Sequence, residues 1–219
     1  MKYIISYNEQ SKGICFNELK NIHANFKELI SLNSEQSIVQ LNIPEQELSS
    51  LIKKNPIIFT RHIFAIHEEL SKPINETEFT NKIINKLNDT KTFSIQFMTN
   101  LNRNNCEVNV QLVADKICLN NFTLNVKNPE QIVSIFETDD KIYLGFGNEN
   151  TNLSSYKAGK PHFSKKDEFI SRAEYKLLEA INLCKIDLSA MKLGADLGSA
   201  PGGWTKVLAN HNIETHSID

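Results

Sequence analysis

A glycine-rich stretch near the end of the chain contains the residue types with the clearest chemical potential. It reads Asp-Leu-Gly-Ser-Ala-Pro-Gly-Gly-Trp over residues 196–204, after an apolar run and before the helix-like pair Val207 and Leu208. A glycine lacks a Cβ, so the backbone can turn sharply and a ligand can approach the peptide N–H groups at the start of a helix. The sequence therefore predicts a short buried strand, a tight turn and a helix from about Pro201 to Asn210.

An acidic residue follows this stretch at an informative distance. Residues 213–219 read as a second strand that ends in Asp219, which comes 219 − 198 = 21 residues after Gly198. In nucleotide-binding strand-helix-strand units, an acid that meets the ribose lies roughly 20 residues after the glycine turn. The spacing favours a nucleoside-bearing cofactor, although a tight turn without any ligand remains an alternative.

A helix with one apolar and one basic face is predicted just upstream. Arg172 and Lys176 lie four residues apart on its polar side, where like charges repel each other. This face is interpreted either as part of a site or as an ordinary solvated surface. The residues expected to form the buried stripe are Ile170, Ala173, Leu177, Ile181 and Cys184.

These two segments together resemble a known enzyme family. The turn lacks the G-x-G-x-x-G spacing of dinucleotide-binding proteins. It resembles motif I of the FtsJ-like S-adenosylmethionine-dependent RNA 2′-O-methyltransferases, and residues 171–179 (Ser-Arg-Ala-Glu-Tyr-Lys-Leu-Leu-Glu) resemble the S-R-A-x-x-K-L-x-E helix of that family. The resemblance implies an S-adenosylmethionine site formed by Ser171, Asp196, Gly198, Ala200, Pro201, Gly202, Gly203, Trp204 and Asp219.

The same resemblance implies a catalytic role for Lys176. It matches the first lysine of the family's lysine-aspartate-lysine-glutamate group, where a cation near the target ribose would stabilise the alkoxide that attacks the methyl group. The other three members of the group have no counterpart in the sequence. We therefore expect residues 167–219 to form an incomplete, Rossmann-like α/β methyltransferase domain that does not methylate RNA by itself. Its two parallel strands are expected to be loosely ordered or to pair with another chain.

An α+β region precedes this domain. Residues 1–70 read as strand, helix, strand, strand, helix, strand, which predicts a ferredoxin-like module with both helices on one face of the sheet. Its expected strands include residues 2–7, 37–43 and 57–66, and its second helix opens at Pro44, with acidic residues in the first turn.

Residues 71–147 are predicted to form a second α+β unit. The pattern indicates a helix around Phe79 and Ile83, strands over 93–99 and 122–126, a helix over 107–119, and a hairpin over 131–145 with an acidic turn. The end of this unit resembles a THUMP domain, an RNA-binding module of RNA-modifying enzymes, and a plain α+β domain is the alternative. The whole order of domains most resembles the RlmM-type enzymes, which methylate a ribose of large-subunit ribosomal RNA.

Residues 148–166 are predicted to be a basic linker. Between residues 151 and 192 the chain has eight basic and five acidic residues, whereas its total of 24 basic and 26 acidic residues gives a net charge of −2. RNA contacts are therefore expected from a local patch, with a solvated linker as the alternative. The candidate RNA-binding residues are Lys157, Lys160, Lys165, Lys166 and Arg172.

The composition argues against membrane-spanning, secreted and metal-binding proteins. The chain has 219 residues, 40% of them hydrophobic and 23% charged, and it contains no apolar run of the roughly 18 residues that a membrane span needs. No signal peptide is recognisable, so a cytoplasmic protein is expected. The four cysteines include no C-x-x-C pair, and no metal site is expected.

Three functions are consistent with these features. The first is the N-terminal, inactive portion of an S-adenosylmethionine-dependent ribosomal RNA 2′-O-methyltransferase. The second is a non-catalytic RNA-binding module built on the THUMP-like unit. The third is a methyltransferase that acts on a base or on transfer RNA, against which the Pro-Gly-Gly-Trp sequence argues.

Overall fold

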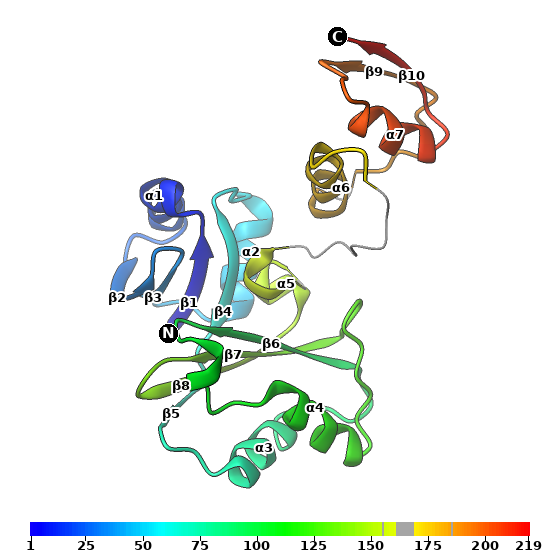
Figure 1. The fold of residues 1–219 in the computed structure, drawn as a ribbon. Helices are drawn as coiled ribbons and strands as arrows, with labels where there is room; N and C mark the ends of the chain where they lie inside the picture. The colour runs from blue at the N-terminus through cyan, green and yellow to red at the C-terminus, as the bar shows by residue number, and fades with distance from the viewer. Residues whose placement is uncertain (155, 161–168, 185) are drawn as a thin grey trace. The chain divides into compact units, whose positions relative to one another are not determined.

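The chain forms two compact α+β units, residues 1–160 and 161–219 (Figure 1). The computed structural model describes residues 1–154, 156–160, 169–184 and 186–219. None of the helices in these described ranges is both long enough and apolar enough to cross a membrane.

The first sheet of the larger unit has four antiparallel strands in the order β2-β3-β1-β4. The predicted order of strands and helices over residues 1–70 is confirmed. The α2 helix has acidic residues in its first turn and lysines in its last turn, an arrangement that favours both ends of the helix dipole. The elements are β1 (Lys2–Tyr7), α1 (Lys12–Ile22), β2 (Lys27–Asn33), β3 (Gln36–Gln40), α2 (Glu45–Lys54) and β4 (Thr60–Ala65), with a short 3-10 helix, η1 (Glu9–Ser11).

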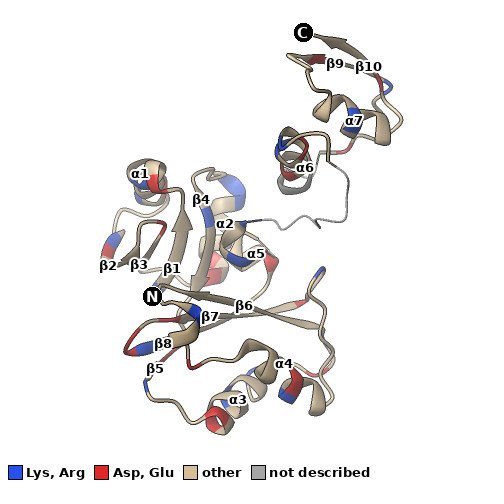
Figure 2. Ribbon diagram, in the orientation of Figure 1, with Lys and Arg blue, Asp and Glu red and all other residues tan. Residues whose placement is uncertain are grey.

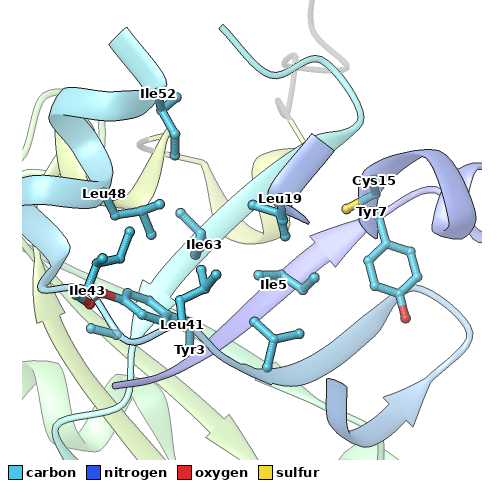
Figure 3. Packing of buried hydrophobic residues seen from close by; sticks show 12 residues of the cluster. Tyr3, Ile5, Tyr7, Cys15, Leu19, Leu41, Ile43, Leu48, Ile52 and Ile63 are labelled. Carbon is cyan, nitrogen blue, oxygen red and sulfur yellow. Dashed lines mark hydrogen bonds between the residues drawn. The ribbon is translucent and has the colours of Figure 1, made fainter. Parts of the chain in front are cut away.

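Both helices cover one face of this sheet, as the sequence predicts. Alternate residues of β1 (Tyr3, Ile5 and Tyr7) point to the same side and are buried. They pack with residues such as Leu19 of α1 and Leu48 of α2 in one apolar cluster (Figure 3).

The second sheet has the order β5-β8-β7-β6, in which β6 and β7 are parallel and the other pairs are antiparallel. The predicted strand over residues 93–99 and the hairpin are confirmed. The elements are β5 (Glu68–Ser71), α3 (Glu76–Ile84), β6 (Phe93–Thr99), α4 (Val110–Leu119), β7 (Gln131–Glu137) and β8 (Lys141–Gly147), with the short helix η2 (Arg103–Asn105).

Two predicted elements of this unit differ from the structure. Residues 122–126 form no strand and make only a single bridge between Leu124 and Phe93. The helix expected from residue 107 begins at Val110, because the backbone N–H groups of Glu107 and Val108 donate to the buried carboxylate of Glu137 and hold the chain extended there.

The two sheets share a core. Ile4 and Phe64, on the helix-free face of the first sheet, pack against Phe136 and Tyr143 of the second. Gly145 of β8 lies so close to β4 that a Cβ there would overlap the Phe64 ring. The predicted boundary after residue 70 falls within β5, which pairs with β8 and is a strand of the second sheet.

The described part of the predicted linker is folded, which corrects the prediction for those residues. The helix α5 (Glu149–Asn152) begins with a capping box between Asn148 and Thr151, and the short helix η3 (Lys157–Gly159) follows. Asn152 is buried, and its Nδ2 donates to Ser134 Oγ over 3.1 Å. The polar residues of this segment therefore cap the N-terminus of α5 instead of remaining solvated. Residues 161–166 lie outside the described part.

The smaller unit contains the predicted strand-helix-strand arrangement. Its strands are parallel and its elements are α6 (Ala173–Leu183), β9 (Leu193–Leu197), α7 (Gly203–Asn210) and β10 (Glu214–Ile218).

Two burial predictions for this unit are wrong. Leu193 and Leu197 of the first strand are 63% and 75% exposed, although such strands are usually covered on both faces. Of the stripe predicted to be buried in the upstream helix, Ile170 (51% exposed) and Cys184 (exposed) lie just outside α6, and Ala173, Leu177 and Ile181 are only partly buried.

Candidate functional site

The glycine-rich loop joins the end of β9 to the start of α7. Gly198 and Gly202 have φ values of +75° and +97°, in the left-handed region that favours glycine. The backbone N–H groups of Gly198 and Ser199 donate to the carbonyl of Ile218 over 2.7 and 3.2 Å, which fixes the loop to the end of β10. The helix begins at Gly203, two residues later than predicted, because Gly202 is not helical.

The outer side of this loop is open. A Cβ placed on Gly198 or on Gly202 would meet no atom of the described residues within 4 Å. The backbone conformation, rather than crowding, therefore explains these two glycines. An open peptide loop before a helix N-terminus is an arrangement that can receive a polar ligand.

The side-chain carboxylate of Asp219 lies beside the loop. Ala200 N–H donates to Asp219 Oδ1 over 3.4 Å, a long hydrogen bond, and Asp219 is exposed. Two predicted cofactor-binding residues that are 19 positions apart in the chain are thereby brought together. An exposed carboxylate at this place can accept hydrogen bonds from vicinal hydroxyl groups.

Asp196 connects three elements from a buried position. It is 4% exposed, and its Oδ2 accepts from the backbone N–H of Thr205 over 2.9 Å and from its hydroxyl over 2.7 Å. The Thr205 hydroxyl also lies 2.8 Å from Ser217 Oγ. A carboxylate bonded to the first turn of α7 complements the helix dipole and fixes the position of the loop.

A second buried carboxylate, missed in the sequence analysis, organises the start of α6. Glu174 is 2% exposed, and its Oε1 accepts from the backbone N–H of Ser171 over 3.1 Å, while Ser171 Oγ accepts from Ala173 N–H over 3.2 Å. Lys206 Nζ lies 3.6 Å from Glu174 Oε2. The Ser-x-x-Glu spacing of a capping box was the available signal for this role.

Gly203 is the contact point of the two helices. A Cβ on Gly203 would overlap Ser171 Oγ and would lie 3.2 Å from Glu174 Cγ. Trp204 supports the same contact, because its Nε1 donates to the carbonyl of Ala173 over 2.7 Å while 43% of the residue remains exposed. Two residues of the predicted cofactor set, Gly203 and Trp204, therefore also join α7 to α6.

The predicted catalytic and RNA-binding residues are placed as follows. Lys176 and Arg172 are exposed on or beside α6, and neither forms an ion pair with another described residue. In the larger unit, Lys160 pairs with Glu35, whereas Lys157 lies over the Phe97 ring. The other two candidates, Lys165 and Lys166, lie outside the described residues. Within the described ranges, no three His, Cys, Asp or Glu side chains are grouped so that they could hold a metal ion.

Comparisons with known proteins identify relatives of this site. Residues 169–218 match the FtsJ-like methyltransferase family. The ribosomal RNA large subunit methyltransferase M of Aliivibrio salmonicida is 26% identical over 194 residues, which cover 79% of this chain and 52% of that protein. The ribosomal RNA large subunit methyltransferase E of a Wolbachia strain from Brugia malayi is 39% identical over 54 residues, which cover 25% of this chain and 24% of that protein.

A solved structure shares the fold. The crystal structure of TrmN from Thermus thermophilus aligns with a TM-score of 0.52 at 9% identity and covers 99% of this chain and 64% of that one. Such a low identity supports a similarity of fold alone. The chain spans about half the length of the methyltransferase M that it matches.

Proposed function

Because residues 169–218 form part of an FtsJ-like methyltransferase domain, we propose that this chain is the N-terminal portion of a ribosomal RNA 2′-O-methyltransferase. The methyl donor of the proposed reaction is S-adenosylmethionine, and the acceptor is a ribose 2′-hydroxyl. The observation that carries this proposal is the open loop over residues 198–203 with a carboxylate at its side.

In the proposed cofactor site, the glycine loop and Asp219 bind different parts of the cofactor. The space beside Gly198 and Gly202 is open, so we place the amino acid part of the cofactor there, against the backbone of the loop. Asp219 accepts hydrogen bonds from the ribose hydroxyls. Asp196 and Ser171 do not contact the cofactor in this proposal. Their hydrogen bonds hold the starts of α7 and α6 in place. When bound, the cofactor supplies an activated methyl group on a sulfonium.

The proposed role of Lys176 is electrostatic. Its ammonium is exposed on α6 and has no ion-pair partner among the described residues, so its charge is available to an incoming anion. A cation beside the ribose would stabilise the negative charge that develops on the attacking oxygen, and it would also attract the RNA phosphates. Arg172, close to the same end of α6, has the second of these functions.

RNA binding is assigned to the larger unit. The strand order β4-β1-β3-β2 with both helices on one face supports a ferredoxin-like module over residues 1–70. The second sheet supports a THUMP-like module over residues 71–147. We place the remaining basic residues, Lys157 and Lys160, at the border between this module and the segment before the methyltransferase domain.

We further propose that the 219-residue chain binds the cofactor without transferring the methyl group. Its described residues supply one strand-helix-strand unit of the domain. Of the family's four-residue catalytic group, Lys176 is the member that has a counterpart in these residues. Binding and transfer should therefore be separable in this chain.

A calorimetric titration of the chain with S-adenosylmethionine tests the cofactor site. We expect heat with the wild type, and loss of that heat in Gly202→Val, because a branched side chain is strongly disfavoured at a φ of +97°. Gly13→Ala is the matched control, since Gly13 lies in α1 and a Cβ there meets nothing within 4 Å. Absence of heat with the wild type would reject the proposed site, and methylation of ribosomal RNA by this chain would reject the separation of binding from transfer.

A further inference from the structure

A cavity of about 610 Å³ opens beside the edge strand β6 of the second sheet. Its lining comes from β6, from η2 and the segment after it, from the first turn of α4, and from η3. All of these elements belong to the larger unit. The volume lies within the range of roughly 300–1,000 Å³ that is typical of small-molecule sites.

One wall of this cavity is apolar and aromatic. Ile95, Phe97 and Thr99 alternate along β6 and therefore project to the same side of the strand. β6 is the last strand of the sheet order, so among the described residues no further strand covers its outer edge, which meets only the single bridge between Phe93 and Leu124. Phe97 is partly buried, and Val108 and Val110 extend the apolar surface. A flat group that enters the cavity would meet the side chain of Phe97.

Two cations lie at the same cavity without a compensating acid. Arg103 and Lys157 both line it, and neither forms an ion pair with a carboxylate of the described residues. Lys157 Nζ lies 5.9 Å from the centroid of the Phe97 ring. Burial, together with the positive charge of Arg103, lowers the pKa of Lys157. The two charges thus repel each other, and an anion bound between them would relieve this repulsion.

Other cations of the unit that are paired with acids differ from Arg103 and Lys157. Both charge types occur along the ribbon of the larger unit (Figure 2), and lysines such as Lys72 and Lys116 are paired with glutamates. Cations beside an aromatic ring are typical of protein sites that bind single-stranded nucleic acids, because bases stack on the ring and phosphates bind the cations.

We propose that this cavity binds one unpaired nucleotide of the RNA substrate, with its base against Phe97 and its phosphate between Arg103 and Lys157. The proposal rests on the RNA substrate assigned above and adds the form in which the RNA is recognised. A base inside a duplex is already stacked on both sides, so the cavity selects a single-stranded end or a nucleotide that is turned out of a helix.

Fluorescence anisotropy with a labelled six-nucleotide RNA and a duplex of equal length tests this proposal. We expect the full chain to bind the single strand more tightly than the duplex. Phe97→Leu should weaken single-strand binding about 5- to 10-fold through loss of stacking, and Phe97→Tyr should preserve it. Circular dichroism shows whether each variant retains its fold.

The salt dependence separates stacking from charge. Lys157→Gln and Arg103→Gln should each reduce the slope of log affinity against log salt by about 0.7, whereas Phe97→Leu should leave this slope unchanged. Lys86→Gln removes an exposed lysine that does not line the cavity, and it controls for the general loss of one charge.

The proposal is overturned if the wild type does not bind the single strand, if it prefers the duplex, or if folded cavity variants bind like the wild type. The cofactor titration distinguishes this failure from failure of the methyltransferase proposal. Phe97→Leu should keep the heat of S-adenosylmethionine binding, and Gly202→Val should keep RNA binding.

Discussion

His62 of β4 makes the stability of the larger unit dependent on pH. Its side chain is fully buried, on the same side of β4 as Phe64, and neither ring nitrogen has a hydrogen-bond partner among the described residues. Burial lowers its pKa from 6.5 to about 4, and the nearby backbone of Asn152 opposes only part of this change. The folded unit therefore holds the imidazole in its neutral form.

The direction and size of the effect follow from proton linkage. The unfolded chain takes up a proton below about pH 6.5, whereas the folded unit does so only near pH 4. The stability is therefore complete above pH 6.5 and falls as the pH decreases toward 4. At 1.36 kcal/mol per pKa unit the full loss is about 3 kcal/mol, of which about 2 kcal/mol occurs between pH 7 and pH 5.

Urea unfolding at pH 7, 6 and 5 measures this loss. Near-ultraviolet circular dichroism of the buried Tyr3 and Tyr7 reports on the larger unit. His62→Leu should remove about 2 kcal/mol of the difference between pH 7 and pH 5, because leucine has a similar volume and no titratable group. His23→Gln, at a partly exposed histidine of the same unit, should behave like the wild type. Equal pH dependence in the wild type and in His62→Leu would refute the reasoning.

Three further predictions test the packing. Glu137→Gln removes the closer charged partner of the buried Lys72, at 2.7 Å, and leaves only Glu107 at 3.8 Å. It should lower the free energy of unfolding by about 3 kcal/mol in urea, with a loss below 1 kcal/mol as the contradicting result. Gly203→Ala should destabilise the smaller unit by about 1–3 kcal/mol, followed by tryptophan emission, and adding Ser171→Ala should recover part of the loss because the overlapping hydroxyl is removed. Leu19→Ala should cost about 2–5 kcal/mol in a thermal or urea melt, and a cost no larger than that of an exposed alanine substitution would contradict its burial.

The parts of the fold that could be predicted depend on local patterns. The strand-favouring residues of β1, the proline and acidic residues at the start of α2, and the alternating apolar residues of β6 each determine an element from within its own sequence. The turn at Gly198 and Gly202 could be predicted for the same reason, because its left-handed backbone conformation favours residues that lack a Cβ.

The parts that could not be predicted depend on distant residues. The start of α4 is set by the Glu137 carboxylate, about 30 positions away, and β5 joins the second sheet through its pairing with β8. At the candidate site, the contact of Gly203 with Ser171 depends on how α6 and α7 pack. The Ser-x-x-Glu signal of Glu174 was present in the sequence, but its burial was not. Sequence spacing can identify a turn or a cap, whereas side-chain neighbours across elements require the fold.

The apolar layer between the two sheets limits how this protein can be divided. Phe64 and Phe136 come from opposite halves of the larger unit, and each is covered by the other half. A cut after residue 70 would separate most of β5 from the second sheet and expose apolar surface on both halves. Separately expressed halves should therefore aggregate. If one half were replaced by the corresponding half of a relative, the close approach of Gly145 to Phe64 would have to be preserved. Substitutions in this apolar layer should therefore require compensating substitutions in the other half.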